Sequence, residues 1–177
     1  MAIYDYDDCG AIISEDKRYR YSLWRVWQKQ KPKVLFVMLN PSTADAENDD
    51  ATIRRCRGYA ESWGYGGFFV GNLFPFRSTE PKELLKCDNP IGDKNEEYLK
   101  TMSEHCCLVV CAWRNSPIVS KIEKRFPDYK PLKHFYHLHY LELSKDGTPK
   151  HPLYLLKTLT PTQYKQGIFG DHYKAQD

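Results

Sequence analysis

Several polar side chains that could bind or act on a ligand follow directly on an apolar run near the start of the chain. The run covers residues 34–39 and is rich in β-branched and aromatic types, which is typical of a strand buried on both faces of a parallel sheet. Ligands bind beyond the carboxyl ends of such strands, so the residues that follow are a candidate site. They are Asn40, Pro41, Ser42, Thr43 and Asp45. The same residue types also form ordinary turns and helix caps, and their spacing leaves both interpretations open.

Two later apolar runs also end in polar side chains and supply further candidates for ligand contacts. The second run gives Asn72, Phe74 and Arg77, and the third gives Trp113, Arg114 and Asn115. The hydroxyls of the first cluster and the Arg77 guanidinium could hold a phosphate, and Trp113 with Arg114 could form a platform for a base. Asn72 is equally consistent with a strand-end cap, and Trp113 with the end of a buried strand.

Basic residues and potential metal ligands outside these strand ends form separate candidate sites. Arg54 and Arg55 lie in a predicted helix at 52–63, where they form either a phosphate clamp or a solvated basic face. His137 and His139 would share one face of a strand, but no Cys or carboxylate stands at a helpful spacing. We therefore expect no metal site and no cofactor.

The elements that must position these residues alternate between strand and helix. Apolar runs at 34–39, 68–74 and 107–113 are separated by helical patterns at 52–63 and 93–103, with a further helix at 118–126 and a strand at 133–138. Connections of this length favour parallel pairing. The sequence predicts a single α/β domain over 1–177, a three-layer αβα sandwich around a mainly parallel central sheet. An N-terminal antiparallel hairpin should form one edge, and the tail from about 160 should be loosely attached.

Composition limits the classes of function. The chain of 177 residues is 41% hydrophobic and 28% charged, and it has no apolar run of about 20 residues that could cross a membrane. Its first residues do not form a secretory signal, so we expect a cytoplasmic protein with six reduced cysteines. A net charge of +3 permits a nucleic-acid partner without arguing for one. A monomer or weak homodimer is expected.

Four short motifs resemble those of an uncharacterised bacterial and phage family of unknown function. The signature is Leu39-Asn-Pro-Ser-Thr-Ala-Asp45, and Asn72-Leu-Phe74, Cys111-Ala-Trp113 and His151-Pro-Leu-Tyr154 are similar to the same family. The resemblance covers most of the chain. It implies no activity.

A more distant resemblance is to the uracil-DNA glycosylase superfamily. Met38-Leu-Asn-Pro-Ser42 stands where mismatch-specific members have Gly-Ile-Asn-Pro-Gly, and 151–157 is similar to their His-Pro-Ser-Tyr-Leu-Leu-Arg loop. The motifs at 71–81 and 109–113 lie between them in the expected order. The chain differs in having Phe76 in place of a cysteine, in lacking the paired N-terminal cysteines of an iron-sulfur cluster, and in lacking a stacking aromatic residue between Asp45 and Arg55.

This resemblance implies a uracil-DNA-glycosylase-like fold and roles for individual residues. His151 would donate to a base carbonyl oxygen as negative charge develops there, Asn40 would position water, and Asp45 would be the carboxylate. Asn72 would pair with the edge of a flipped base. The implied function is that of a DNA-glycosylase-like protein acting on a base in DNA, a modified base included, or on a nucleoside. The alternative is a catalytically silent module that binds a nucleotide or nucleic acid in the same pocket.

Overall fold

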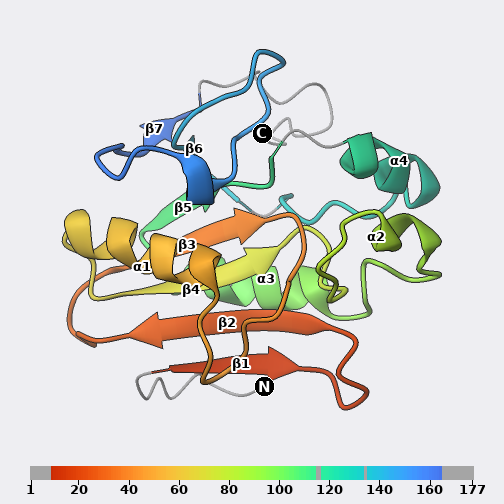
Figure 1. Cartoon of the computed structure of the whole chain (residues 1–177), viewed down its shortest axis with the longest axis horizontal. Coiled ribbons are helices and arrows are strands. Elements are labelled where there is room, and N and C mark those ends of the chain that lie inside the picture. Colours follow the sequence, from red (N-terminus) through yellow and green to blue (C-terminus); the bar gives the residue numbers. More distant parts are fainter. Residues whose placement is uncertain (1–8, 115–116, 134, 165–177) are drawn as a thin grey trace.

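A seven-stranded sheet with helices forms the framework of the protein (Figure 1). The structure is a computed structural model that describes residues 9–114, 117–133 and 135–164. The strands are β1 (Cys9–Ile13), β2 (Arg20–Val26), β3 (Lys33–Met38), β4 (Gly67–Asn72), β5 (Leu108–Cys111), β6 (Leu138–Tyr140) and β7 (Thr162–Gln163). The helices are α1 (Ala51–Ser62), α2 (Glu83–Lys86), α3 (Asn95–Glu104) and α4 (Pro117–Arg125), and a 3₁₀ turn, η1, covers Pro152–Tyr154.

The sheet is mixed: its central strands are parallel, as expected, and antiparallel strands flank them on both sides. Its order is β1-β2-β4-β3-β5-β6-β7, and the four strands from β4 to β6 are parallel. The pairings β1–β2, β2–β4 and β6–β7 are antiparallel. The hairpin of β1 and β2 lies at one edge, as predicted. Its antiparallel strand β2 continues the sheet inward onto β4, and β7 does the same on the other side.

The central strands are apolar on both faces because helices cover both. Side chains alternate along a strand, so Val34 and Phe36 of β3 pack on the α1 side, whereas Leu35 and Val37 pack toward α2, α3 and α4. Helix α1 starts at the Asp50 cap, whose carboxylate accepts a hydrogen bond from the Ile53 backbone N–H at 2.9 Å. The α/β class and the helix–sheet–helix layering therefore follow from the pattern of buried residues.

The order of the parallel strands creates a switch point. Counted along the chain among themselves, β3 is the first, β4 the second, β5 the third and β6 the fourth, so their order in the sheet is 2-1-3-4. The chain therefore adds β4 on one side of β3 and β5 on the other. In doubly wound sheets the crevice at the carboxyl ends of the two strands flanking this reversal is the usual ligand site.

Two predicted segments differ in the structure. The strand expected at 133–138 begins only at Leu138, because residues 131–133 form a turn. The tail from 160 is not wholly loose, since β7 pairs with β6 and Tyr164 packs on Tyr140 with ring centroids 4.7 Å apart. Within the described ranges, no helix has both the length and the apolar character needed to cross a bilayer.

Candidate functional site

A cavity of about 750 Å³ lies at this switch point. The ends of β3 and β5, the start of α1, helices α2 and α4, and the segment before η1 all contribute to its wall. Five of the predicted site residues line it. They are Asn40, Ser42, Trp113, Arg114 and His151. The strand-end residues Asn40, Ser42, Trp113 and Arg114 are thus brought to one cavity, and His151, which the resemblance implied, joins them there.

The two other residues of the turn after β3 do not line this cavity. Pro41 is buried, and its carbonyl oxygen accepts a hydrogen bond from the Ser78 backbone N–H at 2.9 Å. Thr43 is exposed and lies outside the cavity wall. Their contribution is to the shape of the turn.

The Asp45 carboxylate organises a loop and does not face the cavity, contrary to expectation. It accepts hydrogen bonds from the backbone N–H groups of Glu47 at 2.9 Å and Asn48 at 2.8 Å. These bonds lower the pKa of Asp45, because they favour the charged carboxylate. A carboxylate held in this way stabilises the turn between β3 and α1, and it is a weak candidate for a general base.

Three candidates from the second run are also absent from the cavity wall. Asn72 is only 1% exposed, and its side-chain oxygen accepts a bond from Arg20 Nη2 at 3.4 Å. Phe74 is buried in the core beside Tyr129, with ring centroids 6.3 Å apart. The Arg77 guanidinium donates to the Lys17 carbonyl at 3.2 Å. Edge readout by Asn72 and phosphate binding by Arg77 are therefore not favoured by this arrangement. Asn115 lies outside the described residues.

Asn40 reaches the cavity with part of its amide already engaged. Its Nδ2 donates to the Ser78 carbonyl at 2.9 Å and to the Pro41 carbonyl at 3.1 Å. These bonds fix the orientation of the side chain. A contact with water or a ligand would therefore fall to its amide oxygen, which is an acceptor.

Two charged residues, Asp50 and Arg20, stand among the cavity-wall residues that were not predicted as site residues. Asp50 caps helix α1, and it also lines the cavity. Arg20 alternates with apolar residues along β2, yet it is 3% exposed and lines the same cavity. The polar residues Arg20, Ser22 and Arg25 of β2 are all buried. Because side chains on both of its faces are buried, β2 is an inner strand. The alternation of polar and apolar residues along β2 is typical of a strand with one solvent-exposed face, so it did not predict this burial.

His151 is held as a neutral imidazole at the cavity. Its Nδ1 accepts a hydrogen bond from the Leu153 backbone N–H at 3.3 Å, so the proton of the neutral ring is on Nε2. Burial is the main reason that the pKa of His151 falls from 6.5 to about 4, and the Arg114 guanidinium lowers it further while Asp50 acts in the opposite direction. At neutral pH His151 is therefore a hydrogen-bond donor without charge.

Arg114 has an unusual backbone conformation where β5 ends at the cavity. Its φ is +74°, in the left-handed region that residues other than glycine rarely adopt. Its N–H donates to the Pro149 carbonyl at 2.7 Å, which joins the end of β5 to the segment that leads to His151. Such strain is often found at ligand sites, where surrounding contacts maintain it.

Helix α1 fastens the segment that carries His151. Two of its side chains and that of its C-cap residue Trp63, spaced four residues apart, donate to main-chain carbonyls of the C-terminal segment. Arg55 donates through Nε and Nη2 to Leu153 at 3.2 and 2.9 Å, the Tyr59 hydroxyl donates to Leu156 at 2.7 Å, and Trp63 Nε1 donates to Leu159 at 3.0 Å. We call this row of three donors the α1 ladder. Because the donors lie on one helix face, they hold the segment along the helix axis.

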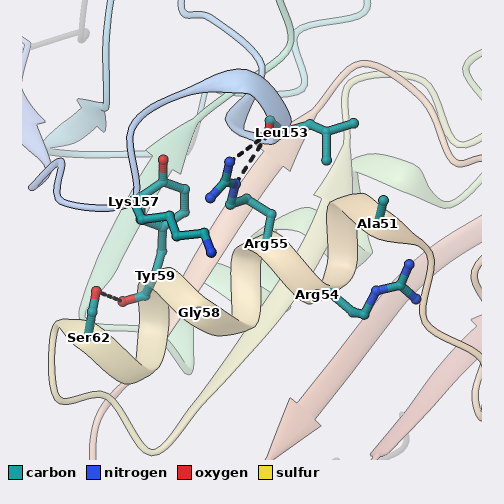
Figure 2. Close-up of a pocket in the computed structure, with 8 residues that line it drawn as sticks. All are labelled: Ala51, Arg54, Arg55, Gly58, Tyr59, Ser62, Leu153 and Lys157. Carbon is teal, nitrogen blue, oxygen red and sulfur yellow. Dashed lines mark hydrogen bonds between the residues drawn. The ribbon is translucent and has the colours of Figure 1, made fainter.

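A second hollow of about 520 Å³ lies along α1, beside the ladder (Figure 2). Arg54, Arg55 and Lys157 line it, and it shares no lining residue with the switch-point cavity. Figure 2 shows Arg55 pointing to the Leu153 carbonyl and Arg54 pointing in another direction. The two arginines that were expected to clamp phosphate together therefore act separately, and Arg55 is engaged in the ladder.

The potential metal ligands among the described residues form no binding cluster, and the cysteines form no disulfide. No group of three or more His, Cys, Asp or Glu side chains among them could hold a metal ion. The six cysteines are free, and burial raises the pKa of Cys56, Cys106 and Cys111 well above the usual value, so those thiols stay protonated.

The fold and the cavity define an α/β protein with a candidate ligand site at the switch point of a doubly wound sheet. Comparison with known families adds a relationship: the family model described as "Protein of unknown function (DUF1643)" matches residues 20–153. The chain belongs to that family, so membership of a family of unknown function is confirmed. No curated protein and no solved structure matches the chain.

Proposed function

We propose that the chain is a uracil-DNA-glycosylase-like protein that cleaves the N-glycosidic bond of a base, in DNA or in a nucleoside. The observation that carries the proposal is His151, a neutral donor at a cavity that Asn40 and Asp50 also line. Cleavage of this bond needs a donor to the departing base, because negative charge develops on its carbonyl oxygen. A neutral imidazole that donates from Nε2 is suited to this task.

Asp50 replaces Asp45 as the proposed carboxylate. It lines the cavity, and its charge acts on His151. A carboxylate in that position can stabilise positive charge on the sugar as the bond breaks. Asn40 would accept a hydrogen bond from the attacking water through its amide oxygen.

The arrangement of the motifs supports the proposed fold relationship. The motifs that start at Met38, Val109 and His151 each contribute residues to the cavity wall, at the end of β3, at the end of β5 and next to η1. In the motif at 71–81, the residues that precede Ser78, including Asn72, do not line the cavity. Motifs in the expected order that converge on one cavity favour a shared architecture, although function must still be argued from the site itself.

The test is a base-release assay. The protein is incubated with oligonucleotides that carry uracil, hypoxanthine or a bulky modified pyrimidine, and with the corresponding nucleosides, and alkali-labile sites or free bases are measured. His151→Ala should slow release by about 100-fold or more, the usual scale for removing one donor to a developing anion. His105→Ala is the matched control, because His105 is exposed and lies outside the cavity wall.

Asp50→Asn tests the carboxylate separately from the helix cap. Asn caps a helix about as well as Asp, so α1 should be retained while the charge is removed. We expect release to slow by about tenfold or more, the scale of one lost charge-assisted contact. Unchanged release in Asp50→Asn would remove Asp50 from the mechanism.

A second candidate is a catalytically silent module that binds a nucleotide or nucleic acid in the same cavity. It is favoured by Asn40, whose amide nitrogen is already engaged by two main-chain carbonyls. Binding without release of any base from the whole panel would support this candidate and exclude the enzyme. Failure to bind nucleic acid even at low salt, where phosphate contacts are strongest, would direct the search to free nucleosides and nucleotides.

A further inference from the structure

The wall of the switch-point cavity carries an excess of positive charge. Five cationic side chains line it, and two carboxylates, Asp50 and Glu80, oppose them. The cations are Arg20, Lys82, Lys86, Arg114 and Lys121. His151 adds no charge at neutral pH. A concave site with this balance concentrates anions, because its low-dielectric walls strengthen the field of the charges.

Arg20 is the most deeply buried of these cations and forms no ion pair with a described carboxylate, although the charges of Asp50 and Asp45 act on it and oppose the lowering of its pKa. It is 3% exposed, its Nη1 donates to the Ala44 carbonyl at 2.9 Å, and its buried Nε has no hydrogen-bond partner within the described part of the chain. Burial lowers the pKa of Arg20 to about 10, so it remains charged at neutral pH. Among the described residues, no carboxylate oxygen lies within ion-pair distance of it. Buried charges are normally paired, because an unpaired one is costly.

Arg25, on the same strand, forms the ion pair that Arg20 lacks. It is 5% exposed, and its guanidinium contacts the Asp49 carboxylate at 2.7 Å. Both arginines lie in β2, but only Arg20 lines the cavity. The arginine that forms an ion pair thus does not line the cavity, and the arginine that forms none does.

Two lysines extend the positive wall toward solvent. Lys82 precedes α2 and Lys121 lies on α4, both exposed, and neither has a hydrogen bond or ion pair with another described side chain. Lys86 differs, since Glu83 lies 2.8 Å from its ammonium group. Helices α2 and α4 lie side by side (Figure 1), so the two lysines come from neighbouring elements.

We propose that this cavity takes a ligand with a terminal phosphate, a nucleoside monophosphate, for which Arg20, Lys82 and Lys121 supply the counter-charge. The proposal rests on the proposed function. It specifies the substrate class as a nucleoside monophosphate, in place of a neutral nucleoside or an internal nucleotide of a strand. A phosphate monoester carries up to two negative charges and several acceptor oxygens, which suits three cations from three elements. The cavity volume of about 750 Å³ is in the range of small-molecule sites.

Calorimetric titration of the full chain tests the phosphate requirement. The probes are uridine and inosine 5′-monophosphates, the two nucleosides, inorganic phosphate, and an oligonucleotide without a terminal phosphate. At least one monophosphate should bind about tenfold or more tightly than its nucleoside, since charge-assisted contacts to phosphate are gained. Inorganic phosphate should compete with it, and the oligonucleotide should bind more weakly than the monophosphate.

Two lysine variants localise the effect. In Lys121→Gln and Lys82→Gln the ratio of nucleoside to monophosphate Kd should fall by about threefold to tenfold for each lost charge. Lys124→Gln is the matched control, because Lys124 lies on the same helix and is exposed but does not line the cavity. Arg20→Gln should abolish the preference. If that variant does not fold, the two lysine variants still decide the question.

The outcomes distinguish this inference from the proposed function. Equal affinity for nucleoside and monophosphate overturns the inference, as does the absence of binding by both monophosphates and by inorganic phosphate. Equal losses in Lys121→Gln and Lys124→Gln overturn it as well. Tight monophosphate binding without base release supports the phosphate site and excludes the enzyme. Base release from nucleosides or from an internal nucleotide, at a rate that a terminal phosphate does not increase, supports the proposed enzyme and refutes the phosphate site.

Discussion

Acidification should destabilise the protein through His151, and the variant His151→Gln should be largely spared. In the unfolded chain this imidazole takes up a proton near its usual pKa of 6.5, whereas in the folded chain it does so only near 4. Between these values the unfolded state binds more protons, so the free energy of unfolding falls as pH falls. The loss begins near pH 6.5 and is complete near pH 4.

The magnitude follows from the difference between the two pKa values. Each pKa unit corresponds to about 1.4 kcal/mol, so wild type should lose about 3 kcal/mol relative to His151→Gln between pH 7 and pH 4. Carboxylates and other histidines also titrate in this range, but they are common to both proteins. Their contributions cancel in the difference between wild type and variant.

Urea denaturation at a series of pH values gives the required free energies, with His105→Gln as the control for an exposed histidine. The wild-type and His105→Gln curves should run parallel, and the His151→Gln curve should converge on them or cross them toward low pH. Parallel curves for wild type and His151→Gln from pH 7 to pH 4 would refute the reasoning. They would mean that His151 titrates normally and is solvated, and that a neutral donor at the cavity does not exist at mildly acidic pH.

Two further predictions concern the fold. Tyr59→Phe should lower the free energy of unfolding by about 1 kcal/mol, because one buried hydrogen bond of the α1 ladder is lost; Tyr154→Phe, at a ring that is 85% exposed, should leave the urea midpoint unchanged, and equal effects would contradict this account. Gly66→Ala should cost about 1–3 kcal/mol, since a Cβ there would lie 2.1 Å from the Gln28 carbonyl oxygen. A Cβ added at Gly58, inside α1, would have no atom within 4 Å, so Gly58→Ala should instead raise the melting temperature through its higher helix propensity. A lower melting temperature in both variants would show that neither helix propensity nor the available space determines the effect of these substitutions.

The elements with strong periodicity could be predicted from the sequence. The apolar run at 34–39 became β3, Lys33–Met38, and the helical spacing at 52–63 became α1, Ala51–Ser62. These segments are specified locally, because burial on both faces or on one helix face leaves a clear pattern. The association of the strand ends with a cavity followed from the same information, and it led to Asn40 and Trp113, whereas His151 was identified only through the resemblance of its loop to that of the glycosylase superfamily.

The residues that sequence reasoning missed depend on tertiary contacts. Arg20 alternates with apolar residues as a solvent-facing side chain would, but tertiary contacts bury it, among them its bonds to the Ala44 carbonyl and to the Asn72 side chain. Asn72 and Phe74 follow an apolar run as site residues do, but Asn95 and Tyr129 close over that strand end with bonds to the Asn72 and Leu73 carbonyls. Long-range burial of this kind has no local signature.

The α1 ladder has a consequence for how freely the C-terminal segment can change. Its donors are side chains, but its acceptors at Leu153 and Leu156 are main-chain carbonyls, which every amino acid possesses. Substitution at those two positions removes no acceptor, whereas substitution of Arg55 or Tyr59 removes a donor. The segment can therefore diverge in sequence, and with it whatever its outward side chains recognise, while the helix keeps His151 at the same place.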